Sequence, residues 1–325
     1  MDSFHQTMFN MSFPYYESKT IEFHKRLGAG HTGEVYSGKL SIGEFTSDCV
    51  IKRLCSSNYE TTKQSLIFDD FTDEVSIGRQ FMNKTNYQIQ FYGYSVDQSE
   101  NELKLYLLME KTSANCDMES FIHDYKNWKR ITKNEYDNSS SSTVMYHGDN
   151  YWDYIVPKND KLNLMIETAK AIQELHTFDI VHCDLKPNNM LVVGNTVKLI
   201  DYNASYELQG ETEIEGNAEI GTSGYMAPEL YNGWISYKTD IYSLGVTMLE
   251  IWFGDIWPTI TDDYKQCRKY VLDYLHLLKK DNLQLYQLIK KCVSTDSNKR
   301  PSIKNIITNL HHILEVVHEV VHEMV

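Results

Sequence analysis

Two stretches near the middle of the chain carry polar side chains that could do chemistry. Residues 181–189 read VHCDLKPNN and residues 197–203 read VKLIDYN, and each stretch ends in polar residues. Together they supply two carboxylates, Asp184 and Asp201, and the amide of Asn189. One carboxylate can accept a proton from a hydroxyl group, while the other, with the amide, can hold Mg²⁺. The two stretches therefore suit metal-assisted transfer to a hydroxyl group.

A glycine-rich segment lies closer to the N-terminus, where residues 27–35 read LGAGHTGEV. Glycines allow a backbone to approach phosphates closely, because no Cβ stands in the way and positive φ is permitted. A dinucleotide-binding unit would require a helix directly after the glycines. Residues 35–40 and 49–52 instead have the pattern of strands, which predicts a hairpin lid. Taken alone, the segment is equally consistent with a simple glycine turn.

Lys52 ends the apolar run 49–52 and could hold nucleotide phosphates as a point charge. A buried lysine needs a counter-charge, and Glu74, on a helix predicted over residues 65–82, is the candidate. In isolation, Lys52 could equally be a lysine at a strand edge, and Glu74 could lie on a solvated helix face.

The glycine lid, the strand lysine and the two polar stretches occur in an order that resembles the eukaryotic protein kinase family, over roughly residues 21–315. Residues 221–229, GTSGYMAPE, resemble the end of a kinase activation segment. Asp240 matches the helix aspartate that holds the backbone of the catalytic loop, and Arg300 matches the partner of Glu229. Lys186-Pro187 and Thr222 resemble the serine/threonine-specific branch.

The resemblance implies a role for each residue of the two polar stretches. Asp184 would be the catalytic base, Lys186 would steady the transferred phosphoryl group, and Thr222 would belong to the same site. Asn189 and Asp201 would bind Mg²⁺.

The resemblance also implies an ATP site. Lys52, oriented by Glu74, would contact the α- and β-phosphates, and the amides of the glycine lid would cover them. Met109 and Glu110 would form the adenine hinge. Leu191 and Val35 would sandwich the base, and Asp117 would reach the ribose. The nucleotide-binding set is Leu27, Gly28, Ala29, Gly30, His31, Thr32, Gly33, Val35, Val50, Lys52, Met109, Glu110, Asp117, Leu191 and Asp201.

Four residues depart from the family pattern. Cys183 replaces the arginine that docks a phosphorylated activation loop, which predicts activity without that phosphorylation. Asn203 stands where glycine follows the metal-binding aspartate, and asparagine tolerates left-handed backbone. Val50 should tighten the adenine pocket. Gly78, one turn after Glu74, weakens the helix and is expected to leave the glutamate mobile.

The pattern of the whole chain predicts an α+β, bilobal, protein kinase-like fold. Strand patterns occur at residues 21–27, 34–40, 49–54, 88–94 and 103–109, whereas helical periodicity dominates from about residue 160, at 162–172, 241–252 and after Arg300-Pro301. We expect an N-terminal extension over 1–20 and a kinase domain over 21–325. Within it, a small β lobe covers 21–110 and a larger helical lobe 111–325, with a polar insertion at about 123–158.

Composition excludes several classes of protein. The chain has 325 residues, of which 42% are hydrophobic and 23% charged, so it can build a sizeable core. A net charge of −14 argues against a broad nucleic-acid surface. Six cysteines without a CxxC pair indicate reduced thiols. With no signal-peptide or membrane-spanning pattern, we expect an intracellular, monomeric enzyme that acts on protein substrates.

Three other functions are compatible with parts of the sequence. A pseudokinase scaffold would explain Cys183, Asn203 and Gly78, but the residues that a kinase needs are present. A small-molecule kinase of related fold would not need the segment 226–229, MAPE. The HExxH motif at 318–322 could bind zinc, although its tandem VVHE repeat is more typical of a solvated helix face.

Overall fold

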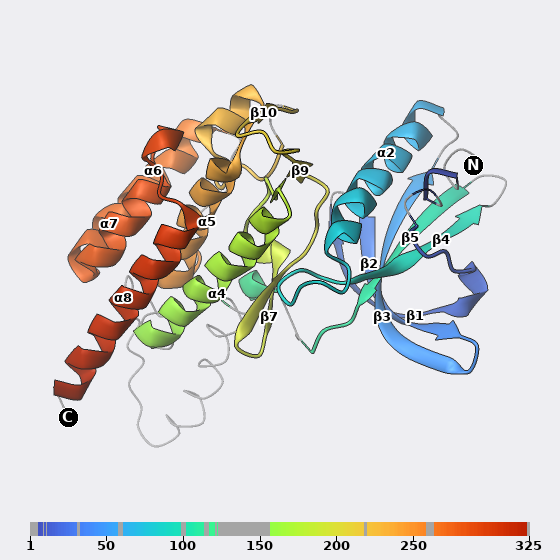
Figure 1. Ribbon diagram of the computed structural model, residues 1–325, viewed down its shortest axis with the longest axis horizontal. Coiled ribbons are helices and arrows are strands. Elements are labelled where there is room, and N and C mark those ends of the chain that lie inside the picture. The colour runs from blue at the N-terminus through green and yellow to red at the C-terminus, as the bar shows by residue number, and fades with distance from the viewer. Residues whose placement is uncertain are drawn as a thin grey trace, which may run out of the picture. The chain divides into compact units, whose positions relative to one another are not determined.

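The computed structural model describes residues 6–8, 10, 12–30, 33–57, 61–98, 102–113, 117–120, 122, 157–217, 220–257 and 263–323. His31, Thr32 and residues 123–156 of the expected insertion lie outside these ranges. The chain divides into two compact units (Figure 1). Residues 1–113 and 201–205 form the first, and residues 114–200 and 206–325 form the second. None of the helices in the described part of the chain combines the length and apolar character that a membrane crossing requires.

The first unit is built on a five-stranded antiparallel sheet of order β1-β2-β3-β5-β4 (Figure 1). Its strands are β1 (Ile21–Gly30), β2 (Gly33–Ile42), β3 (Phe45–Ser57), β4 (Phe91–Gln98) and β5 (Glu102–Glu110). A turn at residues 43–44 joins β2 to β3, whereas helix α2 (Thr61–Gly78) and the 3₁₀ turn η2 (Arg79–Phe81) lie between β3 and β4. A further 3₁₀ turn, η1 (Ser18–Thr20), precedes β1.

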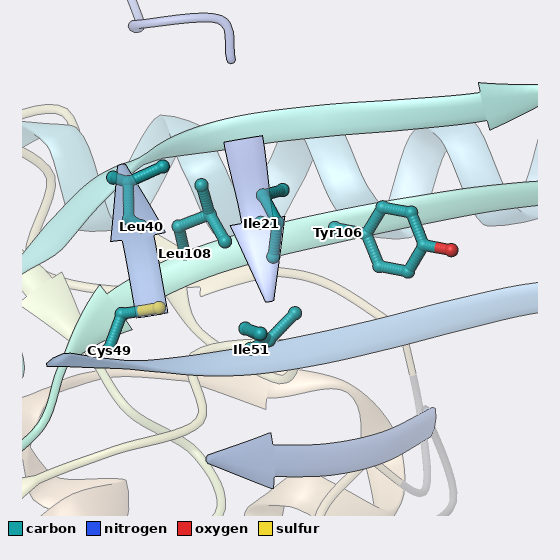
Figure 2. Close-up of a cluster of buried hydrophobic side chains, with 6 residues drawn as sticks. All are labelled: Ile21, Leu40, Cys49, Ile51, Tyr106 and Leu108. Carbon is teal, nitrogen blue, oxygen red and sulfur yellow. The ribbon is translucent and has the colours of Figure 1, made fainter. Parts of the chain in front are cut away.

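Side chains alternate across the sheet and give it two differently covered faces. One face carries the cluster of Ile21, Leu40, Cys49, Ile51, Tyr106 and Leu108 (Figure 2). Lys52, the neighbour of Ile51 in β3, points to the opposite face, against which α2 packs. Strand β3 thus buries apolar side chains on one face and delivers one lysine to the helix on the other.

The second unit is mainly helical (Figure 1). Helices α4 (Lys158–Thr177), α5 (Tyr237–Phe253), α6 (Tyr264–Asp281), α7 (Leu283–Cys292) and α8 (Ile303–Glu323) form its core, in which α4 packs against α5 and α8. Helix α5 is buried from Thr239 to Phe253, and its N-terminus is closed by a capping box in which Ser236 and Thr239 exchange hydrogen bonds.

Short two-stranded sheets hold the loops of the second unit. Strand β6 (Ile180–Val181) pairs with β9 (Tyr206–Glu207), β7 (Met190–Val193) with β8 (Thr196–Leu199), and β10 (Ile214–Glu215) with β11 (Trp234–Ile235). The 3₁₀ turns η4 (Pro187–Asn189), η5 (Pro228–Asn232) and η6 (Ser297–Lys299) complete it.

The predicted α+β class is confirmed, and most predicted elements occur. The strand predicted at 88–94 is misplaced, because β4 begins only at Phe91. The two glutamines before it hold other groups: the Gln90 side chain accepts a hydrogen bond from the Asn83 amide at 2.6 Å, and Gln88 accepts one from Tyr202 at 3.1 Å. The helix predicted at 65–82 ends at Gly78 and continues as a 3₁₀ turn.

Candidate active site

Lys52 and Glu74 form a buried ion pair in the first unit. The Nζ atom of Lys52 donates to both carboxylate oxygens of Glu74 at 2.9 Å, and the two side chains are 7% and 1% exposed. Burial opposes the charge of Lys52, but the carboxylates of Glu74 and Asp201 outweigh it and raise the lysine pKa. The ammonium therefore stays charged, as a phosphate ligand must.

Asp201 completes this charge cluster, since the same Nζ donates to its Oδ1 at 2.9 Å. Asp201 itself has left-handed backbone, with φ of 64°. Asn203, although asparagine tolerates left-handed backbone, has no positive φ. Its side-chain amide instead donates to Oδ1 of Asp201 at 2.8 Å, so the residue in the glycine position helps to fix the aspartate.

Aromatic packing fills the space beside Gly78. A Cβ added at Gly78 would lie 2.0 Å from the ring of Phe91, which occupies the position of the missing side chain. Phe91 in turn packs edge-on against Tyr202, with ring centroids 6.1 Å apart. The ring centroid of Phe81 lies 5.0 Å from that of Tyr202. In this structure Glu74 is held in its ion pair with Lys52.

The glycine-rich segment forms the predicted hairpin. Gly28, Ala29 and Gly30 of β1 pair with Val35, Glu34 and Gly33 of β2. Gly33 has φ of 152°, and a Cβ there would lie 2.3 Å from the carbonyl oxygen of Arg53, so only glycine fits. Leu27, at the start of the segment, is 54% exposed.

The other predicted nucleotide-binding residues are divided between the two units. In the first unit Val50 pairs with Met109 across β3 and β5, and a Glu110 side-chain oxygen accepts a hydrogen bond from the Gln90 amide at 2.9 Å. In the second unit Asp117 forms an isolated bridge with Leu191. One Asp117 oxygen is already engaged, because it accepts the Ser120 amide at 2.6 Å.

Four predicted catalytic residues converge within the second unit. Lys186 Nζ donates to Asp184 Oδ2 at 2.8 Å, and the Thr222 hydroxyl donates to Asp184 Oδ1 at 2.7 Å while it accepts from Lys186. Asn189 Nδ2 donates to the backbone oxygen and to Oδ2 of Asp184, each at 2.9 Å. The Asp184 carboxylate is therefore oriented by three side chains that come from two separate segments.

Asp240, on the buried first turn of α5, holds the loop that carries Asp184. Its carboxylate accepts the backbone amides of His182 and Cys183 at 2.9 and 3.0 Å, and it also contacts His176 at 2.9 Å. Cys183 has φ of 64° and is buried. Burial, followed by the carboxylates of Asp240 and Asp184, raises the pKa of its thiol well above the ordinary value, which argues against a nucleophilic cysteine.

The end of the predicted activation segment is fixed by a buried arginine. Both terminal nitrogens of Arg300 donate to the carboxylate of Glu229, and its Nε donates to the Ser294 carbonyl at 2.9 Å. The family resemblance implies this Arg300–Glu229 pair, and in the structure it is bidentate.

Each unit contains an oxygen donor of the kind that Mg²⁺ prefers. Because Asn189 Nδ2 donates twice to Asp184, its amide oxygen is turned away from that carboxylate and can serve as a ligand. Asp201 supplies a carboxylate. In the described part of the chain, no group of three or more histidine, cysteine, aspartate or glutamate side chains could hold a metal ion. The side chains of His318 and His322 lie outside the described set.

Sequence reasoning missed the supporting residues of both units. Gln88 and Phe91 hold Tyr202 in the first unit. In the second, Asp179 accepts the hydroxyl of Tyr237 and the backbone amide of Gly210. The only sequence signal for Asp179 is its place just before the strand that leads into the catalytic stretch.

Residues 21–311 match the family model described as protein kinase domain. Protein R436 of Acanthamoeba polyphaga mimivirus, provisionally named a serine/threonine-protein kinase, is 32% identical over 48% of this chain and 58% of its own length. The wee-1.3 kinase of Caenorhabditis briggsae, named as membrane-associated and as tyrosine- and threonine-specific, is 30% identical over 46% of this chain and 23% of its own. The Arabidopsis thaliana LEAF RUST 10 receptor-like protein kinase-like 1.1 is 25% identical over 93% of this chain and 46% of its own. The chain thus spans less than two thirds of each of these relatives.

Proposed function

Since this chain belongs to the protein kinase family and has the fold of that family, we propose that it transfers the γ-phosphoryl group of ATP to serine or threonine hydroxyl groups of proteins. Membership of the family implies a phosphotransferase that uses ATP and Mg²⁺ and acts on proteins. The choice of serine and threonine is the finer part of the proposal. The Lys186–Thr222 hydrogen bond and the name of the mimivirus relative support it.

The observation that carries the proposal is the arrangement around Asp184. A catalytic base must present its carboxylate in one defined orientation to the hydroxyl that attacks the phosphorus. Hydrogen bonds from Asn189 and Thr222 hold the two oxygens of Asp184, and the ammonium of Lys186 lies 2.8 Å from one of them. When a phosphoryl group is bound, this ammonium is placed to neutralise charge that develops on it.

The first unit supplies the lysine and the lid that would bind the phosphates of the nucleotide. The charged Lys52 would hold the phosphates, and the lid amides between Gly28 and Gly33 would cover them. Asp201 and Asn189 would hold Mg²⁺, which neutralises phosphate charge and orients the γ-phosphoryl group for in-line attack. Binding, orientation and proton acceptance would thus be divided among named side chains of this chain.

We further propose that activity does not require phosphorylation of the activation segment. Its described part is already anchored by backbone pairing: β9 pairs with β6, and β10 with β11. Gly216 donates to the Gly233 carbonyl at 2.8 Å, and Asn217 donates to the Tyr206 hydroxyl at 3.2 Å. These contacts need no phosphate, and Cys183 could not bind one through a bidentate contact.

Substitution of Asp184 by asparagine tests the proposed chemistry. With γ-labelled ATP and a generic protein substrate, we expect Asp184→Asn to lower the transfer rate by about 10²–10⁴-fold, the usual contribution of general base catalysis. Asp160→Asn, the same substitution at an exposed position in the first turn of α4, is the control and should retain full activity.

Phosphoamino acid analysis of the product decides between serine/threonine and tyrosine specificity. Equal labelling by the wild type and Asp184→Asn would identify a scaffold instead of an enzyme, and phosphotyrosine alone would contradict the serine/threonine assignment.

A further inference from the structure

A short N-terminal segment adds to the open edge of the five-stranded sheet. Strand β4 lies at that edge. The segment forms hydrogen bonds with the backbone of Tyr94, in the middle of β4. The amide of Tyr16 donates to the Tyr94 carbonyl and the amide of Tyr94 donates to the Pro14 carbonyl, both at 2.8 Å. Tyr15 and Tyr94 form a parallel bridge. We call residues 13–16 the strap.

The strap side chains contact both faces of the sheet. Tyr16 packs against the apolar cluster that contains Ile51 and Leu108, on the face opposite Lys52. Phe13, only 4% exposed, stacks on Tyr94 with ring centroids 6.0 Å apart and planes inclined by 14°. Phe13 and Tyr16 therefore contact opposite faces of the sheet, one on each side of the edge strand β4.

Through Tyr94 the strap reaches the helix that carries Glu74. The Tyr94 ring meets the ring of Phe71 edge-on at 6.3 Å, and Phe71 is fully buried on α2. Phe71 lies three residues before Glu74, so the two side chains share one face of the helix. Phe13 also contacts Phe91, the ring that fills the space beside Gly78 at the end of the same helix. The strap therefore touches both rings that support α2 from β4.

Gly93 shows that the strand is adapted to the strap. A Cβ at this position would lie 2.4 Å from the Pro14 carbonyl oxygen and 2.5 Å from the ring of Tyr16. Gly93 has φ of 156°, which disfavours other residues. The backbone approach of the strap is so close that strand β4 accommodates it with glycine.

We propose that the strap is a positioning element for catalysis: Phe13, acting through Tyr94 and Phe91, sets helix α2 and thereby seats the Glu74 carboxylate on Lys52. The inference rests on the proposed kinase function for its kinetic consequence, whereas the seating of Glu74 is a property of the first unit alone. Loss of the strap would leave Lys52 without its fixed ion pair to Glu74, although Asp201 would remain beside it, and would lower kcat.

The test replaces Phe13 in the full chain and measures two quantities. The first is kcat at saturating ATP. The second is the rate at which an amine-reactive ester modifies Lys52, followed by mass spectrometry, because a lysine that is 7% exposed and paired reacts slowly. We expect Phe13→Ala to lower kcat by about tenfold or more, since misplacement of a positioning group is costly, and to raise Lys52 labelling. Phe13→Leu, which keeps most of the apolar volume, should give intermediate values of both.

Phe45→Ala is the matched control. Phe45 is 84% exposed in the same unit, at the turn between β2 and β3, so its loss should change neither quantity. If Phe13→Ala lowers only the melting temperature, while kcat per folded molecule and Lys52 labelling stay at wild-type values, the strap is a passive cover and the inference is wrong. If Phe13→Ala does not fold, Phe13→Leu decides by the same two quantities.

The two proposals fail in different ways. A wild-type protein that transfers no phosphate overturns the proposed function, and the labelling of Lys52 in the Phe13 variants then decides on the strap alone. A wild-type protein that is active, with unchanged kcat and labelling in both Phe13 variants, overturns the strap and leaves the proposed function intact.

Discussion

The hydroxyl group of Thr222 lies between the two charged side chains of the catalytic stretch. It donates to Asp184 at 2.7 Å and accepts from Lys186. A hydrogen bond to a charged group contributes about 1.5–3 kcal/mol. Replacing Thr222 by valine removes this bond at similar volume, so we expect kcat to fall roughly 10–100-fold. Thr222→Ser keeps the hydroxyl and should retain most of the activity in steady-state phosphate transfer.

Thr308→Val provides the control, because Thr308 is exposed on α8 and the substitution is the same. Equal activity of Thr222→Val and Thr222→Ser would show that the hydroxyl does not orient Asp184. A melting temperature measured for each variant separates a loss of orientation from a loss of folding.

At this scale the sequence predicts residue types better than their local geometry. Asp184, Lys186 and Asn189 are close in the chain, so their convergence follows from one short loop. The backbone of Asp201 could not be predicted in this way. Asp201 has left-handed backbone whereas Asn203 does not, and the asparagine side chain bonds back to the aspartate. Spacing in the sequence does not reveal this hydrogen bond.

Helix α2 depends on an aromatic ring that comes from another element. Alanine normally stabilises a helix relative to glycine by about 1 kcal/mol. At Gly78 the added methyl group would lie 2.0 Å from Phe91, so we expect Gly78→Ala to destabilise the protein, with overpacking costing about 1–3 kcal/mol. In the double variant Gly78→Ala, Phe91→Leu, the smaller side chain makes room, and part of that loss should be recovered. Urea unfolding of the two single variants and the double variant measures the coupling, and additive effects would contradict this packing.

The activation segment is an element held by backbone pairing. Because backbone hydrogen bonds hold β6–β9 and β10–β11 and Cys183 offers no bidentate contact to a phosphate, we expect the protein to keep its full kinase activity after complete dephosphorylation. The measurement is transfer activity before and after phosphatase treatment, with the absence of phosphate verified by intact mass. A kinase whose activity depends on its activation-loop phosphate serves as the positive control for the phosphatase. Loss of activity after treatment would show that an added phosphate completes the segment.

Element boundaries follow from the sequence where burial sets them and fail where single hydrogen bonds do. The predicted strands at 21–27, 34–40, 49–54 and 103–109 fall within the observed strands, because alternating apolar side chains cover one face of the sheet. The strand predicted at 88–94 is misplaced, because the observed strand begins at Phe91, while the side chains of Gln88 and Gln90 accept hydrogen bonds from Tyr202 and Asn83. Tyr202 is far from Gln88 in sequence and Asn83 lies in a turn, so the local pattern contains no signal for either hydrogen bond.

For the whole molecule, the sequence predicts a mainly β part followed by a mainly helical part, and the order of elements agrees. It does not predict that described residues before β1 belong to the sheet. Met8 and Phe13 are buried, although the first twenty residues show no regular period. The burial of Phe13 arises from its contact with Tyr94, some eighty residues away in sequence, which local pattern cannot reveal. The small group Asp201–Ser205 likewise joins the first unit through Lys52 and Gln88.

Tyrosine hydroxyls and cysteine thiols with raised pKa values make the stability of the folded protein sensitive to high pH. Burial, aided by Asp179, raises the pKa of Tyr237 to about 12, and burial raises the pKa of Tyr242 to about 12. Burial also raises the pKa of Cys49 to about 11 and of Cys292 to about 12. Lys238 acts in the opposite direction, because burial and the nearby Arg300 lower its pKa. The four tyrosine and cysteine groups with raised pKa values outnumber this one lysine.

These shifts predict that the free energy of unfolding falls as the pH rises above about 9, since ordinary cysteine and tyrosine pKa values lie near 8.5 and 10. Over this range the folded state keeps protons that the unfolded state releases, so raising the pH favours unfolding. The stabilisation is complete below the ordinary pKa values and is lost as the pH approaches 12. Urea midpoints at about pH 8, 10 and 11 measure the fall. In Tyr237→Phe one of these protons is absent, so the midpoint should fall less steeply between about pH 10 and 11 than in the wild type. Parallel curves for the two proteins would show that Tyr237 ionises as readily in the folded chain as in the unfolded one.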